Sequence, residues 1–220
     1  MGIISLEQTD GLYWLGRYSE RVYTTIRLYS RSYDRMLDEN AGGYEEFCRD
    51  LDIPNIYQSS EDFKTRYPFD KEDPNSIMSN LLRAYDNAIV LRETIGSETL
   101  SYIQLAIYEM NKAEKSQAPL IEMQKVMDNI LAFWGIADDI MEDENSRNII
   151  KVGKRVERID LYGRLHQPRE NLVREVSRLA GRIGRCNIHY NESVILNLLE
   201  LVQAPELDYY SIVYEIERIL

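Results

Sequence analysis

Apolar residues recur along most of the chain at steps of three and four, which is the spacing of one face of an α-helix. The first such run begins at Ser5, and Gln8 follows three residues later, as in a capping box. The pattern predicts a long helix that ends at Gly42-Gly43. Its apolar seam comprises Leu12, Leu15, Ser19, Val22, Ile26, Tyr29, Tyr33 and Met36.

The later segments with helical periodicity are delimited by residues that start or break helices. Asp caps a helix and Pro fits its first turn, whereas Gly and Pro interrupt one. The predicted boundaries are a start at Asp73-Pro74, a break at Gly96-Ser97, a start at Ser116 to Pro119, a start at Asn145 or Ser146, an end at Pro168 and a break at Pro205.

No segment alternates polar and apolar residues in the manner of a strand. Residues 44–73 are the least regular part, and we expect a short helix near 44–51 followed by a long ordered loop. A chain of 220 residues can bury a core without disulfides or metal. We therefore expect an all-α fold, a single-domain bundle of about seven or eight helices over residues 1–220.

One short phrase occurs twice inside these helical patterns. Gly16-Arg17-Tyr18-Ser19-Glu20-Arg21 and Gly153-Lys154-Arg155-Val156-Glu157-Arg158 both read Gly-basic-x-x-Glu-Arg, and the match continues to Arg27 and Arg164. A glycine inside a helix costs about 0.5–1 kcal/mol relative to alanine. Its recurrence predicts a pseudo-symmetric pair of helices and close contact with another backbone or a ligand.

Two interpretations of the phrase remain open. The glutamates form structural ion pairs with arginines on neighbouring helices, or they line a polar pocket for an anionic or amide-bearing ligand. The candidate residues under either interpretation are Gly16, Arg17, Glu20, Arg21, Arg27, Gly153, Glu157, Arg158 and Arg164.

The charge balance narrows the classes of partner. There are 26 basic and 37 acidic residues, a net charge of −11, which argues against non-specific binding of nucleic acid or anionic membrane. No apolar run approaches the length of a membrane span, and the first ten residues lack a signal-peptide core. Cys48 and Cys186 show no partner spacing, so we expect a cytoplasmic protein.

Two charged clusters compete with the repeated phrase. Asp138, Asp139 and Glu142 could hold Mg²⁺ for a diphosphate if one helix carried them all, and a solvated helix end is the structural alternative. The second cluster forms a stripe that meets acids of another helix or subunit, or binds a phosphate-bearing ligand or acidic partner. This stripe consists of Arg174, Arg178, Arg182 and Arg185.

The sequence also resembles a known family. Leu12-Tyr13-Trp14-Leu15-Gly16-Arg17-Tyr18-Ser19-Glu20-Arg21 is similar to the opening of the alpha-E domain family, a helical group of largely unknown function named for its Glu-Arg motif. Asp73 to Ile77, Asn87-Ala88, Arg92 and Ser97-Glu98 resemble its middle segment, and Met141 with the second phrase resembles its second Glu-Arg helix. The resemblance adds Asn87 and Arg92 to the candidate residues.

The resemblance implies a function by context. Such proteins are commonly encoded or fused with ATP-grasp-type ligases and transglutaminase-like peptidases, which implies an auxiliary role in a peptide-ligation or peptide-tagging system. The alternatives are a Mg²⁺-dependent enzyme that acts on a diphosphate, and a purely structural homo-oligomer. We find no nucleophile–base pair at motif spacing and predict no cofactor, so the balance is toward a non-enzyme.

Overall fold

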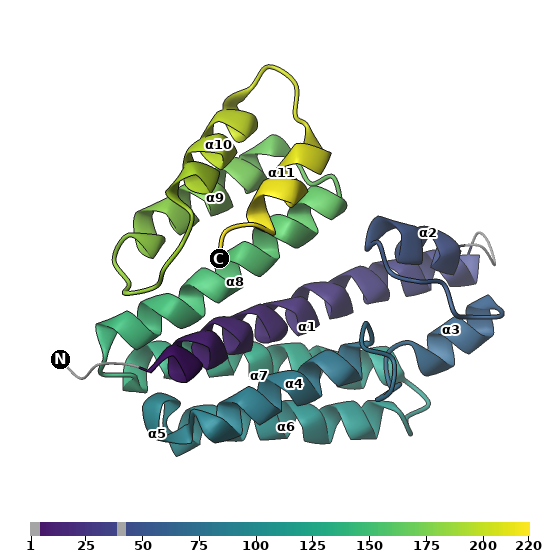
Figure 1. Ribbon diagram of the computed structural model, residues 1–220. Coiled ribbons are helices and arrows are strands. Elements are labelled where there is room, and N and C mark those ends of the chain that lie inside the picture. Colours follow the sequence, from purple (N-terminus) through teal and green to yellow (C-terminus); the bar gives the residue numbers. More distant parts are fainter. Residues whose placement is uncertain (1–4, 39–42) are drawn as a thin grey trace. The chain divides into compact units, whose positions relative to one another are not determined.

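The computed structural model describes residues 5–38 and 43–220, which form eleven helices and no strand (Figure 1). The all-α prediction is confirmed. Two short helices, α3 and α5, were not predicted as separate elements. The helices are α1 (Leu6–Asp38), α2 (Gly43–Asp50), α3 (Ser60–Arg66), α4 (Ile77–Val90), α5 (Arg92–Ile95), α6 (Ser97–Ala113), α7 (Pro119–Ile140), α8 (Glu144–Arg164), α9 (Arg169–Ile183), α10 (Glu192–Gln203) and α11 (Tyr209–Ile216).

The start of α1 is the capping box that the sequence predicts. The backbone N–H of Gln8 donates to Ser5 Oγ at 3.1 Å, and the N–H of Ser5 donates to Gln8 Oε1 at 3.3 Å. The predicted apolar seam is buried along its length apart from Tyr33, which is partly exposed. Gly42, half of the predicted stop, lies outside the described residues, and Gly43 begins α2.

The predicted helix start at Asp73-Pro74 is wrong by about one turn. Ser76 caps α4 instead, because its hydroxyl oxygen accepts the N–H of Ser79 at 2.9 Å. The Asp73 carboxylate is used otherwise, since it accepts the hydroxyl of Tyr57 at 2.6 Å and the N–H of Asn75 at 2.9 Å.

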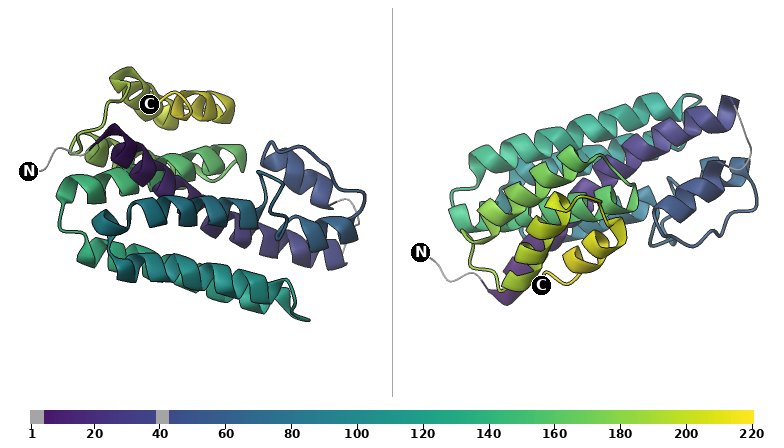
Figure 2. Two further views of the ribbon diagram at one scale, coloured as in Figure 1. Left: turned by 60° about the horizontal axis from the view of Figure 1, so that its bottom comes forward. Right: turned by 90° about the horizontal axis from the view of Figure 1, so that it is seen from above.

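The chain divides into two compact units, which we describe separately. The terminal unit consists of residues 1–17 and 142–220, and the central unit consists of residues 18–141. Helix α1 therefore contributes its first residues to the terminal unit and its remainder to the central unit. In the central unit α4, α6 and α7 run side by side, as Figures 1 and 2 show.

An aromatic cluster orders the irregular segment of the central unit. Phe63 of α3 stacks on Tyr67 with ring centroids 4.9 Å apart, and Phe47 of α2 meets the Tyr67 ring edge-on at 5.0 Å. Tyr29 of α1 joins them and donates its hydroxyl to the carbonyl of Lys64 at 3.0 Å. Aromatic burial thus explains why residues 44–73 contain packed structure rather than only a loop.

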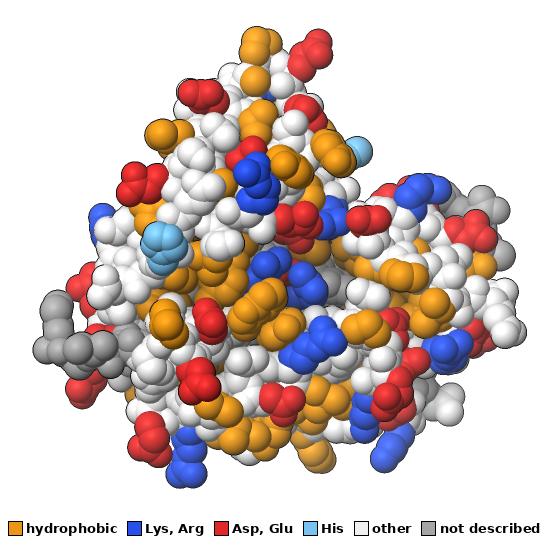
Figure 3. Space-filling model, viewed as in Figure 1, with side chains coloured by type: hydrophobic (Ala, Val, Ile, Leu, Met, Phe, Trp, Pro, Cys, Tyr) orange, Lys and Arg blue, Asp and Glu red, His pale blue; other side chains and the backbone are white. Residues whose placement is uncertain are grey.

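Exposed hydrophobic side chains are spread over several helices. Val90 of α4, Tyr108 of α6 and Tyr210 of α11 are examples, and Figure 3 shows hydrophobic side chains interspersed with acidic and basic ones on the visible face. Within residues 5–38 and 43–220, no helix combines the length and the apolar character needed to cross a membrane.

In the terminal unit, α8 is packed by α9 and α11, and α10 covers α9 (Figure 2). The start of α1 approaches α8 at the two glycines of the repeated phrase. A Cβ built on Gly16 would overlap the carbonyl oxygen of Ile150, and one built on Gly153 would overlap that of Tyr13. The two contacts are reciprocal, and both confirm the predicted close contact of glycine with another backbone.

Replacing either glycine with alanine should therefore destabilise the protein. Gly16→Ala and Gly153→Ala should each lower the free energy of unfolding by about 1–3 kcal/mol, because a backbone carbonyl cannot move aside as a side chain can. Chemical denaturation measures the change. Gly181→Ala in α9 is the control: nothing lies within 4 Å of its Cβ, so stability should rise by about 0.5–1 kcal/mol. A stabilising effect at Gly16 would contradict the close contact.

Candidate functional site

The glycine contact places Arg17 of the first phrase against Glu157 of the second. Arg17 Nε donates to Glu157 Oε2 at 2.7 Å, and the carboxylate is fully buried. The Arg17 guanidinium also lies over the Trp14 ring, 5.0 Å from its centroid. Burial alone would lower the pKa of Arg17, but the charge of Glu157 and its hydrogen bond, together with Tyr13 and Asp160, outweigh burial and the pKa is raised.

A second buried acid lies nearly one turn further along α8. Burial and the charge of Glu157 together raise the pKa of Asp160 above its ordinary value. Arg164 opposes both effects, since its Nε donates to Asp160 Oδ1 at 3.0 Å. The same guanidinium donates to Glu217, just beyond the end of α11. Arg164, a residue of the extended repeat, therefore ties α8 to the C-terminal end of the chain.

Removing the Glu157 carboxylate should be costly. Glu157→Gln leaves the Arg17 cation largely buried without its carboxylate, and such a loss typically costs about 3–5 kcal/mol. For a chain of this length the melting temperature should fall by about 6–20 °C. Arg218→Ala is the control, because its pair with Glu215 is exposed on the arginine side and such pairs contribute about 1 kcal/mol or less. An unchanged melting temperature in Glu157→Gln would indicate that the carboxylate is retained for function instead.

The Glu-Arg pair of the first phrase lies in the central unit. Glu20 is buried and accepts the hydroxyl of Thr24 at 2.9 Å, an interaction within α1. Arg21 lies near Tyr67, where burial raises the pKa of the tyrosine well above its ordinary value and the arginine charge opposes that rise.

The other candidate residues of the central unit contact residues close to them in the sequence. Asn87 donates to a backbone carbonyl one turn earlier in α4, and Arg92 Nε donates to the hydroxyl of Ser97 at 2.9 Å. Arg27 is exposed beside the ring of Tyr23. These contacts give each side chain a local structural role.

The three acidic residues proposed to hold Mg²⁺, Asp138, Asp139 and Glu142, do not lie on one helix. Helix α7 ends at Ile140, so Glu142 does not share a helix with Asp138 and Asp139, and all three side chains are exposed. Across the described part of the chain, no group of three or more His, Cys, Asp or Glu side chains is placed to hold a metal ion.

A different acid gathers the arginines of the terminal unit. Glu175 of α9 is fully buried, and Arg155 of α8 donates Nη1 to its Oε2 at 2.5 Å. Arg178 donates Nη1 to Oε1 at 3.0 Å, while Arg174 and Arg158 approach Oε1 at 3.4 and 3.8 Å. Burial would raise the pKa of Glu175, but the charges of Arg155, Arg158 and Arg178 and the hydrogen bond from Arg155 together outweigh burial, so the pKa is lowered.

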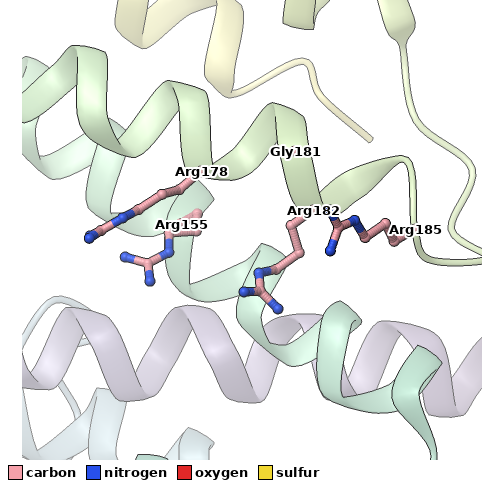
Figure 4. Close-up of a pocket in the computed structure, with 5 residues that line it drawn as sticks. All are labelled: Arg155, Arg178, Gly181, Arg182 and Arg185. Carbon is pink, nitrogen blue, oxygen red and sulfur yellow. The ribbon is translucent and has the colours of Figure 1, made fainter.

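Beside this ion pair lies a hollow lined by arginine. We call Arg155, Arg178, Arg182 and Arg185 the arginine cluster. With Gly181 they line a space of about 340 Å³ between α8 and α9 (Figure 4). Arg182 is positioned by Asn148 of α8, whose Oδ1 accepts its Nη1 at 2.7 Å. Three of the four predicted stripe arginines thus line one hollow.

The cluster belongs to the basic part of an acidic chain. Residues 147–185 contain eleven Arg and Lys against four Asp and Glu, whereas the whole chain carries −11. The sequence pattern predicted the arginine stripe but not Glu175, the buried acid that accepts from Arg155 and Arg178. The available signal was Glu175 itself, which stands beside the apolar residues Leu172, Val176 and Leu179 of α9.

The lowered pKa of Glu175 predicts a dependence of stability on pH. Its folded pKa lies below the unfolded value of about 4.3, so ionisation adds stability above that pH, and the gain is lost as pH falls through the folded pKa. The difference in unfolding free energy between wild type and Glu175→Gln should therefore shrink from pH 6 to pH 3. Denaturation at several pH values measures it, with exposed Glu170→Gln as control. A constant difference would contradict the prediction.

The fold and these sites define an all-helical domain in which Glu-Arg pairs lie on two long helices. A family model, Alpha-E, described as a predicted alpha-helical domain with a conserved ER motif, matches residues 8–210. The chain belongs to the Alpha-E family, as its resemblance implied. No curated protein and no solved structure matches the chain.

Proposed function

We propose that this protein is a binding module whose arginine cluster recognises an oxyanion, carboxylate or phosphate, on a partner. The observation that carries the proposal is the excess of arginine over acid around Glu175. One carboxylate neutralises one positive charge, yet Arg155 and Arg178 both donate to it, and Arg185 lines the adjacent hollow. Arginine binds carboxylate and phosphate through paired N–H donors, so the surplus suits either group.

The exposure of the cluster also favours recognition. The Arg178 side chain is half exposed and Arg185 is exposed, and Arg185 makes no ion pair with any residue in the described ranges. A basic face on a chain of net charge −11 attracts acidic groups locally while the rest of the molecule repels polyanions such as nucleic acid.

Family membership suggests the partner. An auxiliary component of a peptide-ligation system needs to hold the ligase, the peptidase or the peptide being modified. We therefore propose an ATP-grasp-type ligase, a transglutaminase-like peptidase or their peptide substrate as the molecule that carries the oxyanion. The proposal assigns binding to the chain and assigns the chemistry to the partner.

A binding measurement with matched variants tests the proposal. The wild type and the double variant Arg178→Gln/Arg185→Gln are titrated with the proposed partners, an ATP-grasp-type ligase and a transglutaminase-like peptidase. The double variant should bind about tenfold more weakly and with a shallower dependence on salt. Arg174→Gln is the control, because Arg174 lies on the same helix but does not line the hollow.

Two outcomes would overturn the proposal. One is that the double variant binds the partners no more weakly than the wild type, either because both bind equally well or because neither binds. The other is that the wild type self-associates in sedimentation and the double variant is monomeric, which would make the cluster a subunit interface.

A further inference from the structure

The hollow beside Glu175 has N–H donors left after its internal bonds are counted. Arg155 donates one N–H, from Nη1, to Glu175. Arg178 also donates from Nη1 to Glu175, and Arg182 donates from Nη1 to the side chain of Asn148. A guanidinium carries five N–H donors, so Arg155, Arg178 and Arg185 can donate to several further oxygens.

The charge of the hollow selects among oxyanions. Arg155, Arg178 and Arg185 outnumber the single Glu175 carboxylate, which leaves two positive charges in excess. A carboxylate would neutralise one of these charges. A phosphate monoester carries about 1.5–2 negative charges at neutral pH and offers three acceptor oxygens, and a diphosphate carries more. The balance of charge and of donors therefore favours a phosphate ligand over a carboxylate.

The shape of the hollow fits a ligand of this kind. Its volume of about 340 Å³ lies at the small end of ligand pockets, which range from about 300 to 1,000 Å³. Gly181 leaves the wall of α9 without a side chain, since a Cβ there would meet nothing within 4 Å. Figure 4 shows the arginine side chains from both helices around this part of α9.

We infer that the hollow between α8 and α9 is a binding site for a phosphate group, as a phosphomonoester or a diphosphate. This inference rests on the proposed function, because it names the oxyanion that the cluster recognises. Arg155 and Arg178 are held by Glu175, and Arg182 is held by Asn148, so much of the site is formed before the ligand arrives. Pre-positioning of donors lowers the ordering cost of binding.

Calorimetry with inorganic pyrophosphate tests the inference, with the dicarboxylate glutarate titrated at the same pH and ionic strength. Pyrophosphate should bind the wild type, and glutarate should bind at least tenfold more weakly. Arg185→Gln should raise the Kd for pyrophosphate by about tenfold to hundredfold, since it removes a charged donor. Arg174→Gln is the matched control and should leave the Kd within about twofold.

A second variant tests whether the ligand occupies the hollow, because it fills the space without changing the charge. Gly181→Leu keeps every arginine and improves the intrinsic helix propensity of α9, but its side chain would project into the hollow. Pyrophosphate binding should fall at least tenfold in this variant, while circular dichroism and the melting temperature remain those of a folded protein.

The outcomes distinguish the inference from the proposed function. Equal binding of glutarate and pyrophosphate would overturn the phosphate assignment and leave oxyanion recognition in place. Absence of pyrophosphate binding, or undiminished binding in both Arg185→Gln and Gly181→Leu, would also overturn the assignment. The titrations with partner proteins then decide the proposed function independently.

Discussion

The contact of two helix backbones at Gly16 and Gly153 sets the register of the terminal unit. Each glycine faces a carbonyl of the opposite helix, so a side chain at either position would force α1 and α8 apart. Arg17 follows the first glycine directly, and Glu157 lies one turn beyond the second. The buried ion pair between them follows from this register. Each glycine weakens its own helix locally, but the two helices can make this contact only because both positions lack a side chain.

Helix α8 takes part in two buried ion pairs, once as the acceptor and once as the donor. Glu157 on α8 accepts from Arg17 of α1, and Glu175 on α9 accepts from Arg155 of α8. Both acids are fully buried, and a buried carboxylate needs a cation close by. Around Glu175, however, arginine is present well beyond that need. The two sites show the difference between a pair that suffices for structure and a cluster that leaves charge for another molecule.

Local signals in the sequence predicted much of this fold and little of the candidate site. The Ser5–Gln8 capping box and the break at Gly96 depend on neighbouring residues alone, so they can be read directly. The start of α4 was placed wrongly, because Tyr57 competes for Asp73 from sixteen residues away. Glu175 was missed because its arginine partner on α8 is twenty residues distant, and spacing along one helix does not reveal such a contact.

Repulsion among the arginines alone is weak evidence for a ligand. Like charges one turn apart on a helix destabilise it by only a few tenths of a kcal/mol per pair, and an acidic chain lowers that cost further. The Nε of Arg155 is stronger evidence. A buried donor without an acceptor costs about 1–3 kcal/mol, more than the repulsion of several exposed pairs. The fold therefore keeps the Arg155 guanidinium beside the hollow at a cost in stability, as functional groups often are kept. The excess of arginine over acid around Glu175, held in place at this cost, therefore supports a ligand for the hollow.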